Sequence, residues 1–365
     1  MRITFLSWRD LTHPDGGGAE VFVEQVAGGL AARGHEVTLL CPRHPALRRP
    51  TVRDGFRLLP RGGRLTVYLH GLAFLLSREG RRQDVVVDAI NGLPFGAPLV
   101  RRRGLLALVH HVHREQWRII YPGLGGRLGW FVESQVVPRL YRRVPVVTVS
   151  EASRADLEEL GFEPDHLRVV RNGTPQLPPA RLAESATPRV VVLARLVPHK
   201  QVEDAVDLVA ALLPRHPDLV LDVVGDGWWA GAVDAQISSQ GLARQVVRHG
   251  WVDEQTKADL LAQAWLMVLP SVKEGWGIAV LEAAAAGRPT VAYRRAGGTA
   301  ESVVDGITGV LVDEPEELVE QVAALLGDHE RRRRLGEAAQ ARAASLTWEQ
   351  TTACFAEAVE RAYCP

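Results

Sequence analysis

Short apolar runs alternate with longer amphipathic stretches along the 365 residues of the chain. A run such as Leu266–Leu269 is short and apolar at every position, which is typical of a strand buried on both faces of a parallel sheet. The stretches between these runs place apolar residues at helical spacing. Because strands that alternate with helices build parallel sheets, the pattern predicts an α/β protein.

The pattern also predicts where most elements lie. The predicted strands are Arg2–Leu6, Val37–Cys41, Val85–Asp88, Leu105–Val109, Val146–Val149, Val190–Leu193, Val220–Val224, Val246–His249, Leu266–Leu269 and Thr290–Ala292. The predicted helices are Ala19–Arg33, Leu65–Glu79, Arg127–Arg143, Glu151–Leu160, Val202–Leu213, Glu254–Ala264 and Ile278–Ala286, and the chain is expected to be helical from Pro315 nearly to its end. Ser150 is the expected N-cap of the helix that follows it.

The alternation stops between residues 172 and 188, where Pro, Ser and Ala are frequent and no periodicity remains. Such a segment is typical of a linker, and 365 residues are enough for two domains of ordinary size. The sequence therefore predicts a first domain over residues 1–173, a linker over 174–188, a second domain over 189–345 and a C-terminal helix within 346–365.

Composition narrows the class of protein. Apolar residues make up 46% of the chain, which indicates a globular protein. The three cysteines Cys41, Cys354 and Cys364 have neither metal-ligand spacing nor an even number, so they favour a reducing compartment. We find neither a signal peptide nor an apolar stretch of membrane-spanning length, and we expect a cytoplasmic protein.

Charge is unevenly distributed along the chain. Residues 1–150 contain 22 Lys and Arg and 11 Asp and Glu, whereas the rest contains 21 and 32. A basic first part attracts anionic ligands or an anionic membrane surface, unless its arginines only form a solvated face. No nucleic-acid-binding module is recognisable, and we expect no nucleic-acid partner.

Two glutamates, Glu274 and Glu282, bracket a glycine-containing loop and the first turns of a predicted helix. A buried strand ends just before them, and ligands in open α/β sheets bind beyond the carboxyl ends of strands. Amides at a helix N-terminus favour phosphate, and an acidic residue nearby can accept hydrogen bonds from a ribose diol. The pair indicates a sugar-nucleotide site, although two glutamates at this spacing also occur by chance on a solvated helix.

Further candidates follow other strands of the second half. Arg195 and Lys200 come after one strand, where two cations suit a diphosphate unless both are simply solvated. The turn at residues 225–227 has the sequence Gly-Asp-Gly, which lets backbone approach a ligand. It is not a dinucleotide fingerprint, because Ala230 stands where the third glycine belongs, and Val21 breaks the same pattern after Gly16 and Gly18.

Three histidines, His110, His111 and His113, follow the strand that ends at Val109. Adjacent residues at a strand end point in opposite directions, so at most two of the three could bind one metal ion. We expect no metal site. One of the three is expected to contact a sugar, and the others to pack or hydrogen-bond locally.

Taken together, the Gly-Gly-Gly-Ala-Glu loop, the histidine-bearing strand end, Arg-Leu-Val-Pro-His-Lys, Gly-Asp-Gly and the glutamates eight positions apart resemble the retaining GT-B glycosyltransferases of family four, also described as group 1. The resemblance covers nearly the whole chain. It implies two Rossmann-like domains, each with a doubly wound parallel sheet, that face a cleft, and a last helix that crosses back to the first domain.

The resemblance also implies roles for residues. Arg195 and Lys200 would bind the donor pyrophosphate, Glu274 would contact the donor sugar, and Glu282 would hold the ribose diol. The catalytic set is then His113, Arg195, Lys200 and Glu274, and the substrate-binding set is Gly17, Gly18, Gly225, Val252, Gly275, Trp276, Gly277, Ile278 and Glu282. In two places the chain departs from the family: His199 replaces a small or acidic residue, and Gln201 stands where glycine is usual.

The implied activity is retaining transfer of a sugar from a nucleoside diphosphate sugar, with neither a metal nor another cofactor. The expected acceptor is anionic or membrane-associated, such as an envelope glycan, a glycolipid or a small natural product, and the protein would then work at the inner face of the membrane. Two alternatives remain open from sequence: a two-domain protein that binds sugar nucleotides without chemistry, and an epimerase or hydrolase on the same fold.

Overall fold

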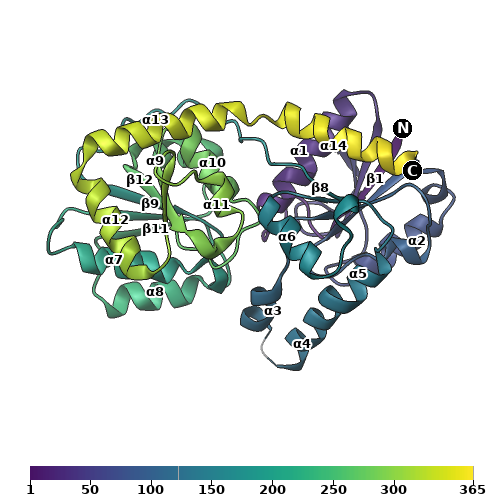
Figure 1. Cartoon of the computed structure of the whole chain (residues 1–365), viewed down its shortest axis with the longest axis horizontal. Helices are drawn as coiled ribbons and strands as arrows, with labels where there is room; N and C mark the ends of the chain where they lie inside the picture. Colours follow the sequence, from purple (N-terminus) through teal and green to yellow (C-terminus); the bar gives the residue numbers. More distant parts are fainter. Residues whose placement is uncertain (122, 365) are drawn as a thin grey trace. The chain divides into compact units, whose positions relative to one another are not determined.

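The structure, a computed structural model, describes residues 1–121 and 123–364 (Figure 1). Its chain divides into two compact units, one made of Met1–Gly173 with Trp348–Pro365 and the other of Thr174–Thr347. Pro365, the last residue of the predicted terminal segment, lies outside the described residues. Each unit contains one sheet with helices packed against it, so the predicted α/β class is confirmed.

Unit 1 is built on a sheet of eight strands in the order β3-β4-β2-β1-β5-β6-β7-β8. Their bounds are β1 Arg2–Leu6, β2 Glu36–Cys41, β3 Thr51–Arg53, β4 Phe56–Pro60, β5 Val85–Ile90, β6 Leu105–Val109, β7 Val146–Thr148 and β8 Leu167–Val169. Neighbours pair in parallel, except for the antiparallel hairpin of β3 and β4. The central strands are buried along their whole length, as their continuous apolar runs predicted.

The helices of unit 1 include one from the far end of the chain. They are α1 Gly18–Ala32, α2 Val67–Leu76, α3 Arg114–Ile120, α4 Leu124–Phe131, α5 Val137–Leu140, α6 Glu151–Glu159 and α14 Trp348–Tyr363. Helix α14 packs against α1, β5 and β6, and its Phe355 stacks on Phe5 with ring centroids 5.8 Å apart. The predicted cap of α6 is present, because Oγ of Ser150 accepts a hydrogen bond from the amide of Ser153 at 3.0 Å.

Unit 2 contains six parallel strands in the order β11-β10-β9-β12-β13-β14. Their bounds are β9 Arg189–Leu193, β10 Val220–Val224, β11 Val246–Gly250, β12 Leu266–Leu269, β13 Thr290–Tyr293 and β14 Gly309–Val312. The chain builds outwards from β9 in one direction and then from β12 in the other. The neighbours β9 and β12 therefore form a topological switch point, which is where open α/β sheets bind ligands.

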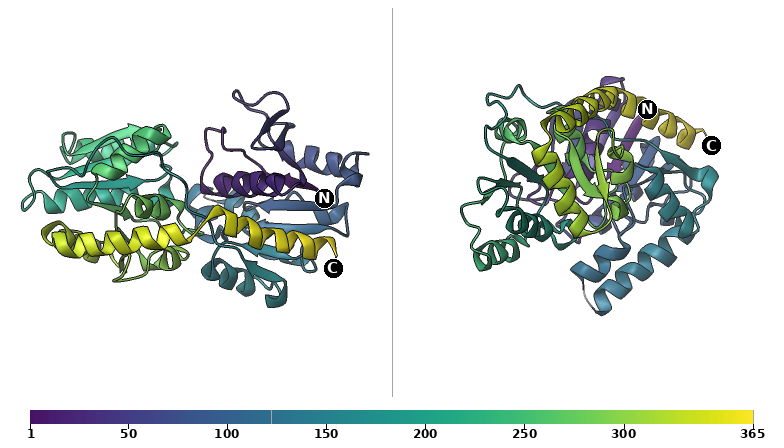
Figure 2. Two further views of the ribbon diagram at one scale, coloured as in Figure 1. Left: turned by 90° about the horizontal axis from the view of Figure 1, so that it is seen from above. Right: turned by 60° about the vertical axis from the view of Figure 1, so that its left-hand side comes forward.

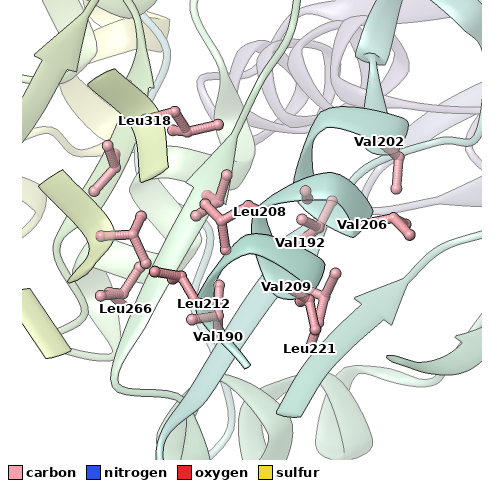
Figure 3. Packing of buried hydrophobic residues seen from close by; sticks show 14 of the residues in the cluster. Val190, Val192, Val202, Val206, Leu208, Val209, Leu212, Leu221, Leu266 and Leu318 are labelled. Carbon is pink, nitrogen blue, oxygen red and sulfur yellow. The ribbon is translucent and has the colours of Figure 1, made fainter. Parts of the chain in front are cut away.

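The helices of unit 2 cover both faces of this sheet (Figure 2). They are α7 Val202–Leu212, α8 Ala230–Ser239, α9 Glu254–Gln263, α10 Ile278–Ala285, α11 Thr299–Ser302, α12 Pro315–Gly327 and α13 His329–Ser345. Figure 3 shows the core on one face, where Val190 and Val192 of β9 lie among Leu208 and Leu212 of α7. This packing holds β9 in place, and with it the loop that carries Arg195.

One prediction about an element was wrong, and several elements were not predicted. The helix predicted over Arg127–Arg143 is interrupted, because the chain passes from α4 through a π-helical turn at Val132–Val136 into α5. Strands β3, β4, β8 and β14 and helices α3, α8 and α11 were not predicted. Among the described residues, no helix is both long and apolar enough to cross a membrane.

Candidate active site

The loops that follow β9 and β12 bring Lys200 and Glu274 together. Nζ of Lys200 lies 2.5 Å from Oε1 of Glu274, and the same oxygen accepts a hydrogen bond from Oγ of Ser271 at 2.7 Å. The two loops are also joined through their backbones, because the amide of Val272 donates to the carbonyl of His199 at 2.9 Å. Two of the predicted site residues therefore form an ion pair at the switch point of the sheet.

The loop that carries Arg195 is held by the Gly-Asp-Gly turn. Its residues Ala194 and Leu196 donate backbone hydrogen bonds to the carbonyls of Val224 and Asp226, both at 3.0 Å. A Cβ atom at Gly225 would lie 2.1 Å from the carbonyl oxygen of Ala194. The glycine is thus required by close packing on a neighbouring loop of the protein, and the approach of its backbone to a ligand stays a prediction.

The phosphate-binding candidate is the N-terminus of α10. Gly277 caps the helix in a left-handed conformation with φ of 89°, and Ile278 is the first helical residue. The first amides of a helix have no partner within it and favour an anion. Gly275 packs closely on Gly298, because a Cβ at Gly298 would lie 1.9 Å from the carbonyl oxygen of Gly275. Trp276, the next residue, is buried.

Glu282 lies in the second turn of α10 and pairs with a lysine that we did not predict. Nζ of Lys257, on α9, lies 2.5 Å from Oε1 of Glu282 and 2.9 Å from Glu254. Burial raises the pKa of the Glu282 carboxyl. Burial alone would lower the pKa of Lys257, but the carboxylates of Glu282 and Glu254 outweigh it and raise that pKa.

A signal for Lys257 was present in the sequence. The chain contains 43 Lys and Arg, of which only Lys200, Lys257 and Lys273 are lysines. Lys273 is adjacent to Glu274, so all three belong to the elements of unit 2 that carry the predicted site. A residue type that is rare elsewhere and gathered at one site indicates a specific need for it.

Val252, a member of the predicted substrate-binding set, follows β11. The strand ends at Gly250, which has a φ of 65° and accepts a backbone hydrogen bond from Gly225 at 2.8 Å. Val252 packs against the hydrophobic cluster around β12, whereas Trp251 beside it is exposed. Backbone hydrogen bonds at Gly225 and Ala194 therefore join the loops that follow β9, β10 and β11 at one edge of the sheet.

The predicted site residues of unit 1 include Gly17 and Gly18, at the N-terminus of α1. The amide of Gly17 donates to Oε2 of Glu20 at 2.7 Å and so forms part of a capping box. A Cβ at Gly17 would meet only that oxygen, at 3.8 Å. Unlike Gly225, this glycine is not required by close packing of the surrounding protein.

The histidines of unit 1 differ in what surrounds them. Both ring nitrogens of His113 have partners: Nδ1 lies 2.9 Å from Oε1 of Glu133 and Nε2 lies 2.7 Å from Oδ1 of Asn91. His110 is half-buried in a recess that Asn91 also lines, and its Nε2 is buried without a hydrogen-bond partner among the described residues. Burial lowers the pKa of His110 to about 4, so its ring is neutral at pH 7.

Within residues 1–121 and 123–364, no three His, Cys, Asp or Glu side chains lie close enough together to bind one metal ion. The structure joins Lys200 to Glu274 and the Arg195 loop to the Gly225 turn. It pairs Glu282 with Lys257 rather than with another predicted residue. Gly17, Gly18 and His113 belong to the other unit.

Comparison with known families covers nearly the whole chain. The model of Glycosyl transferases group 1 matches residues 175–342, and that of Glycosyltransferase Family 4 matches residues 16–176. An MMP alpha-(1->4)-mannosyltransferase of Mycolicibacterium hassiacum is 30% identical, with 99% of each chain covered. A D-inositol 3-phosphate glycosyltransferase of an Arthrobacter strain is 28% identical over 95% of this chain and 91% of the relative.

Solved structures agree on the fold. Sucrose-phosphate synthase from Thermosynechococcus elongatus superposes with a TM-score of 0.83 at 19% identity, covering 99% of both chains. HepE of Anabaena, determined in complex with UDP-glucose, gives a TM-score of 0.77 at 20% identity, covering 98% of this chain and 99% of that one. The chain therefore belongs to glycosyltransferase family four, and it is a glycosyltransferase with the GT-B fold of two Rossmann-like domains.

Proposed function

We propose that this glycosyltransferase uses a nucleoside diphosphate sugar as donor and transfers the sugar with retention, without a metal ion. The observation that carries the proposal is the Lys200–Glu274 pair at the switch point of unit 2, beside the N-terminus of α10. A cation, a carboxylate and helix amides suit a diphosphate joined to a sugar. HepE of Anabaena, which shares the fold and whose structure contains UDP-glucose, supports this choice of donor.

In this proposal Arg195, Lys200 and the amides of residues 275–278 bind the donor pyrophosphate. Negative charge grows on the nucleoside diphosphate as the sugar leaves, and fixed cations and helix dipoles that already point there lower the barrier. Arg195 suits bidentate contact with phosphate oxygens, whereas Lys200 supplies a compact charge. Together they take the part that a divalent ion plays in metal-dependent transferases.

Glu274 would bind hydroxyl groups of the donor sugar, and Glu282 would bind the ribose diol. Lys200 and Ser271 both hold Oε1 of Glu274 and thereby fix the direction of the carboxylate. Lys257 does the same for Glu282. A carboxylate whose direction is fixed before the substrate arrives loses less conformational entropy on binding.

The remaining site residues contact the sugar, the base or the acceptor in this proposal. His113 is the predicted sugar contact, and we extend the proposal to His110, because a neutral, half-buried histidine with an unengaged Nε2 can hydrogen-bond a sugar hydroxyl. Gly17 and Gly18 would lie near the donor phosphate or the acceptor. The backbone around Val252 would contact the base, and the segment with Trp276 would support the phosphate site.

Retention can be obtained by a front-face route. The bond between the anomeric carbon and the diphosphate oxygen breaks, the acceptor oxygen bonds to the same face of the sugar, and the acceptor proton passes to the departing diphosphate. This route depends on positioning and on charge stabilisation rather than on a protein nucleophile. Glu274 is accordingly assigned to binding, because Lys200 and Ser271 already engage its carboxylate.

The proposed acceptor is anionic or membrane-associated, which would place the enzyme in the cytoplasm at the inner face of the membrane. The excess of arginine in residues 1–150 supports this, because that charge attracts phosphate groups. The name of the Arthrobacter relative includes a phosphorylated acceptor.

The test is whether the full chain turns over UDP-, GDP-, ADP- or dTDP-sugars. Turnover is measured as release of the nucleoside diphosphate, in the presence of a chelator. We expect Lys200→Ala and Glu282→Ala to abolish transfer while the chain stays folded, and Glu316→Ala, at an exposed glutamate of α12, to leave it unchanged. NMR of the product gives the anomeric configuration. Near-normal turnover of both site variants, or inversion at the anomeric carbon, would contradict the proposal.

A further inference from the structure

Helices α3 and α4 and the turn after them expose an unusual number of large apolar side chains. The two helices extend from unit 1 as a hairpin (Figures 1 and 2). We call the surface formed by these residues the α3–α4 surface; its apolar members, 39% to 82% exposed, are Ile119, Tyr121, Leu124, Leu128, Phe131 and Val136. Exposed apolar side chains that are gathered on one segment, rather than scattered singly over a surface, indicate an interaction site.

The amphipathicity of α4 is inverted. Its large residues Leu124, Leu128 and Phe131 follow helical spacing and are 82%, 65% and 55% exposed. Its inner face carries two glycines beside the half-buried Trp130: a Cβ at Gly126 would lie 2.1 Å from the carbonyl oxygen of Tyr121, and one at Gly129 would lie 2.4 Å from the ring of Trp117. A helix in water normally turns its large apolar residues inwards. The sequence of α4 therefore fits an apolar environment on its outer side.

The exposed charges of the hairpin are mainly positive. Residues 114–136 contain three arginines and two glutamates. Glu133 is only 4% exposed and binds His113 and Trp117 from inside the unit, whereas Arg118 and Arg127 are exposed. Of the two glutamates, Glu115 is half-buried. The α3–α4 surface thus combines apolar side chains with exposed cations.

We propose that the α3–α4 surface docks on a bilayer that contains anionic phospholipids. Leu124, Leu128 and Phe131 enter the boundary between headgroups and acyl chains, and Arg118 and Arg127 lie at the phosphate groups. A second copy of the chain is a poorer partner, because a symmetric interface would bring the same arginines together. This docking rests on the proposed location at the inner face of the membrane, but it concerns unit 1 alone and does not depend on which donor the enzyme uses.

The test is co-flotation of the full chain with vesicles, in the absence of any sugar donor. One set contains phosphatidylglycerol and phosphatidylcholine in equal parts, and the other phosphatidylcholine alone. We expect binding to the anionic vesicles only, weakened by added salt. Replacing both Arg118 and Arg127 by Gln should weaken it about 25-fold, since each basic residue near an anionic surface contributes about fivefold.

The apolar part is tested by Leu124→Glu with Leu128→Glu, compared with Val52→Glu and Leu99→Glu. The control pair lies in the same unit, is 71% and 68% exposed, and adds the same charge outside the surface. We expect the first variant to lose flotation and the control to keep it, with equal thermal stability. Equal binding to both kinds of vesicle, equal loss in the two variants, or concentration-dependent dimers that the first variant abolishes would overturn the proposal.

Discussion

Lys257 can be removed in a way that tests whether it holds Glu282. The side chains of Lys257 and Glu282 are 14% and 11% exposed, and their charged atoms lie 2.5 Å apart. Breaking a buried pair by removing one partner typically costs about 3–5 kcal/mol, because the other charge is left without compensation. Since this pair retains some exposure, we expect Lys257→Met to lower the free energy of unfolding by about 3 kcal/mol at pH 7.

The loss should depend on pH in a defined direction. Burial raises the pKa of Glu282 above its unfolded value, and without Lys257 nothing from α9 offsets that effect. A carboxyl whose pKa is raised on folding favours the folded state when protonated, and this contribution is lost as the pH rises through the folded pKa. The difference in free energy of unfolding between Lys257→Met and wild type should therefore become smaller as the pH falls from 7 towards 5.

The assay is thermal unfolding of the full chain at both pH values. For a domain of this size each kcal/mol shifts Tm by about 2–4 °C, so the variant should melt about 6–12 °C lower at pH 7. Adding Glu282→Gln to Lys257→Met should recover most of the loss, whereas Glu254→Gln alone, which removes only the exposed partner, should cost under about 0.5 kcal/mol. An unchanged Tm, or a deficit that does not depend on pH, would refute the reasoning.

Three further predictions concern single residues. Gly225→Ala should destabilise unit 2 by about 2 kcal/mol or more and weaken donor binding, because its Cβ would overlap the carbonyl of Ala194; unchanged melting and affinity would contradict this. Gln201→Gly should stabilise the protein by about 1 kcal/mol in denaturant unfolding, because Gln201 has a left-handed φ of 44°; a loss of stability would show that the side chain contributes more than the strain costs. Between pH 7 and pH 4, His110→Gln should lose about 2–3 kcal/mol less free energy of unfolding than wild type. The reason is that His110 gains a proton near pH 6.5 in the unfolded chain but only near pH 4 in the folded one. The same dependence of stability on pH in both proteins would argue against burial of a neutral ring.

Much of the fold could be predicted because buried parallel strands leave continuous apolar runs, and all ten predicted strands are present. The hairpin of β3 and β4 was missed because β3 is largely exposed and β4 ends in a proline. The hairpin could have been predicted from Asp54-Gly55, because Asp-Gly favours a two-residue hairpin turn. Both residues do have a positive φ in the structure. The break after α4 could not be predicted, because the apolar spacing continues through the π-helical turn.

The candidate site was predictable as far as it depends on strand ends. Lys200 and Glu274 both follow strands that meet at the switch point, and they do pair. The scarcity of lysine pointed to Lys257, but its pairing with Glu282 could not be predicted, because the contact between α9 and α10 depends on how two helices pack. The glycines showed a different limit: Gly225 and Gly17 look alike in sequence, but only the structure shows that one is required by packing and the other is not.

The central claim is that unit 2 binds a nucleoside diphosphate through Lys200 and Glu282. Calorimetric titration of the full chain with UDP, GDP, ADP and dTDP tests it most directly, alongside Lys200→Ala, Glu282→Ala and the control Glu316→Ala. The account predicts that at least one diphosphate binds, that both site variants weaken it about tenfold or more, and that the control does not. The absence of binding by all four, or equal affinity in every variant, would contradict it.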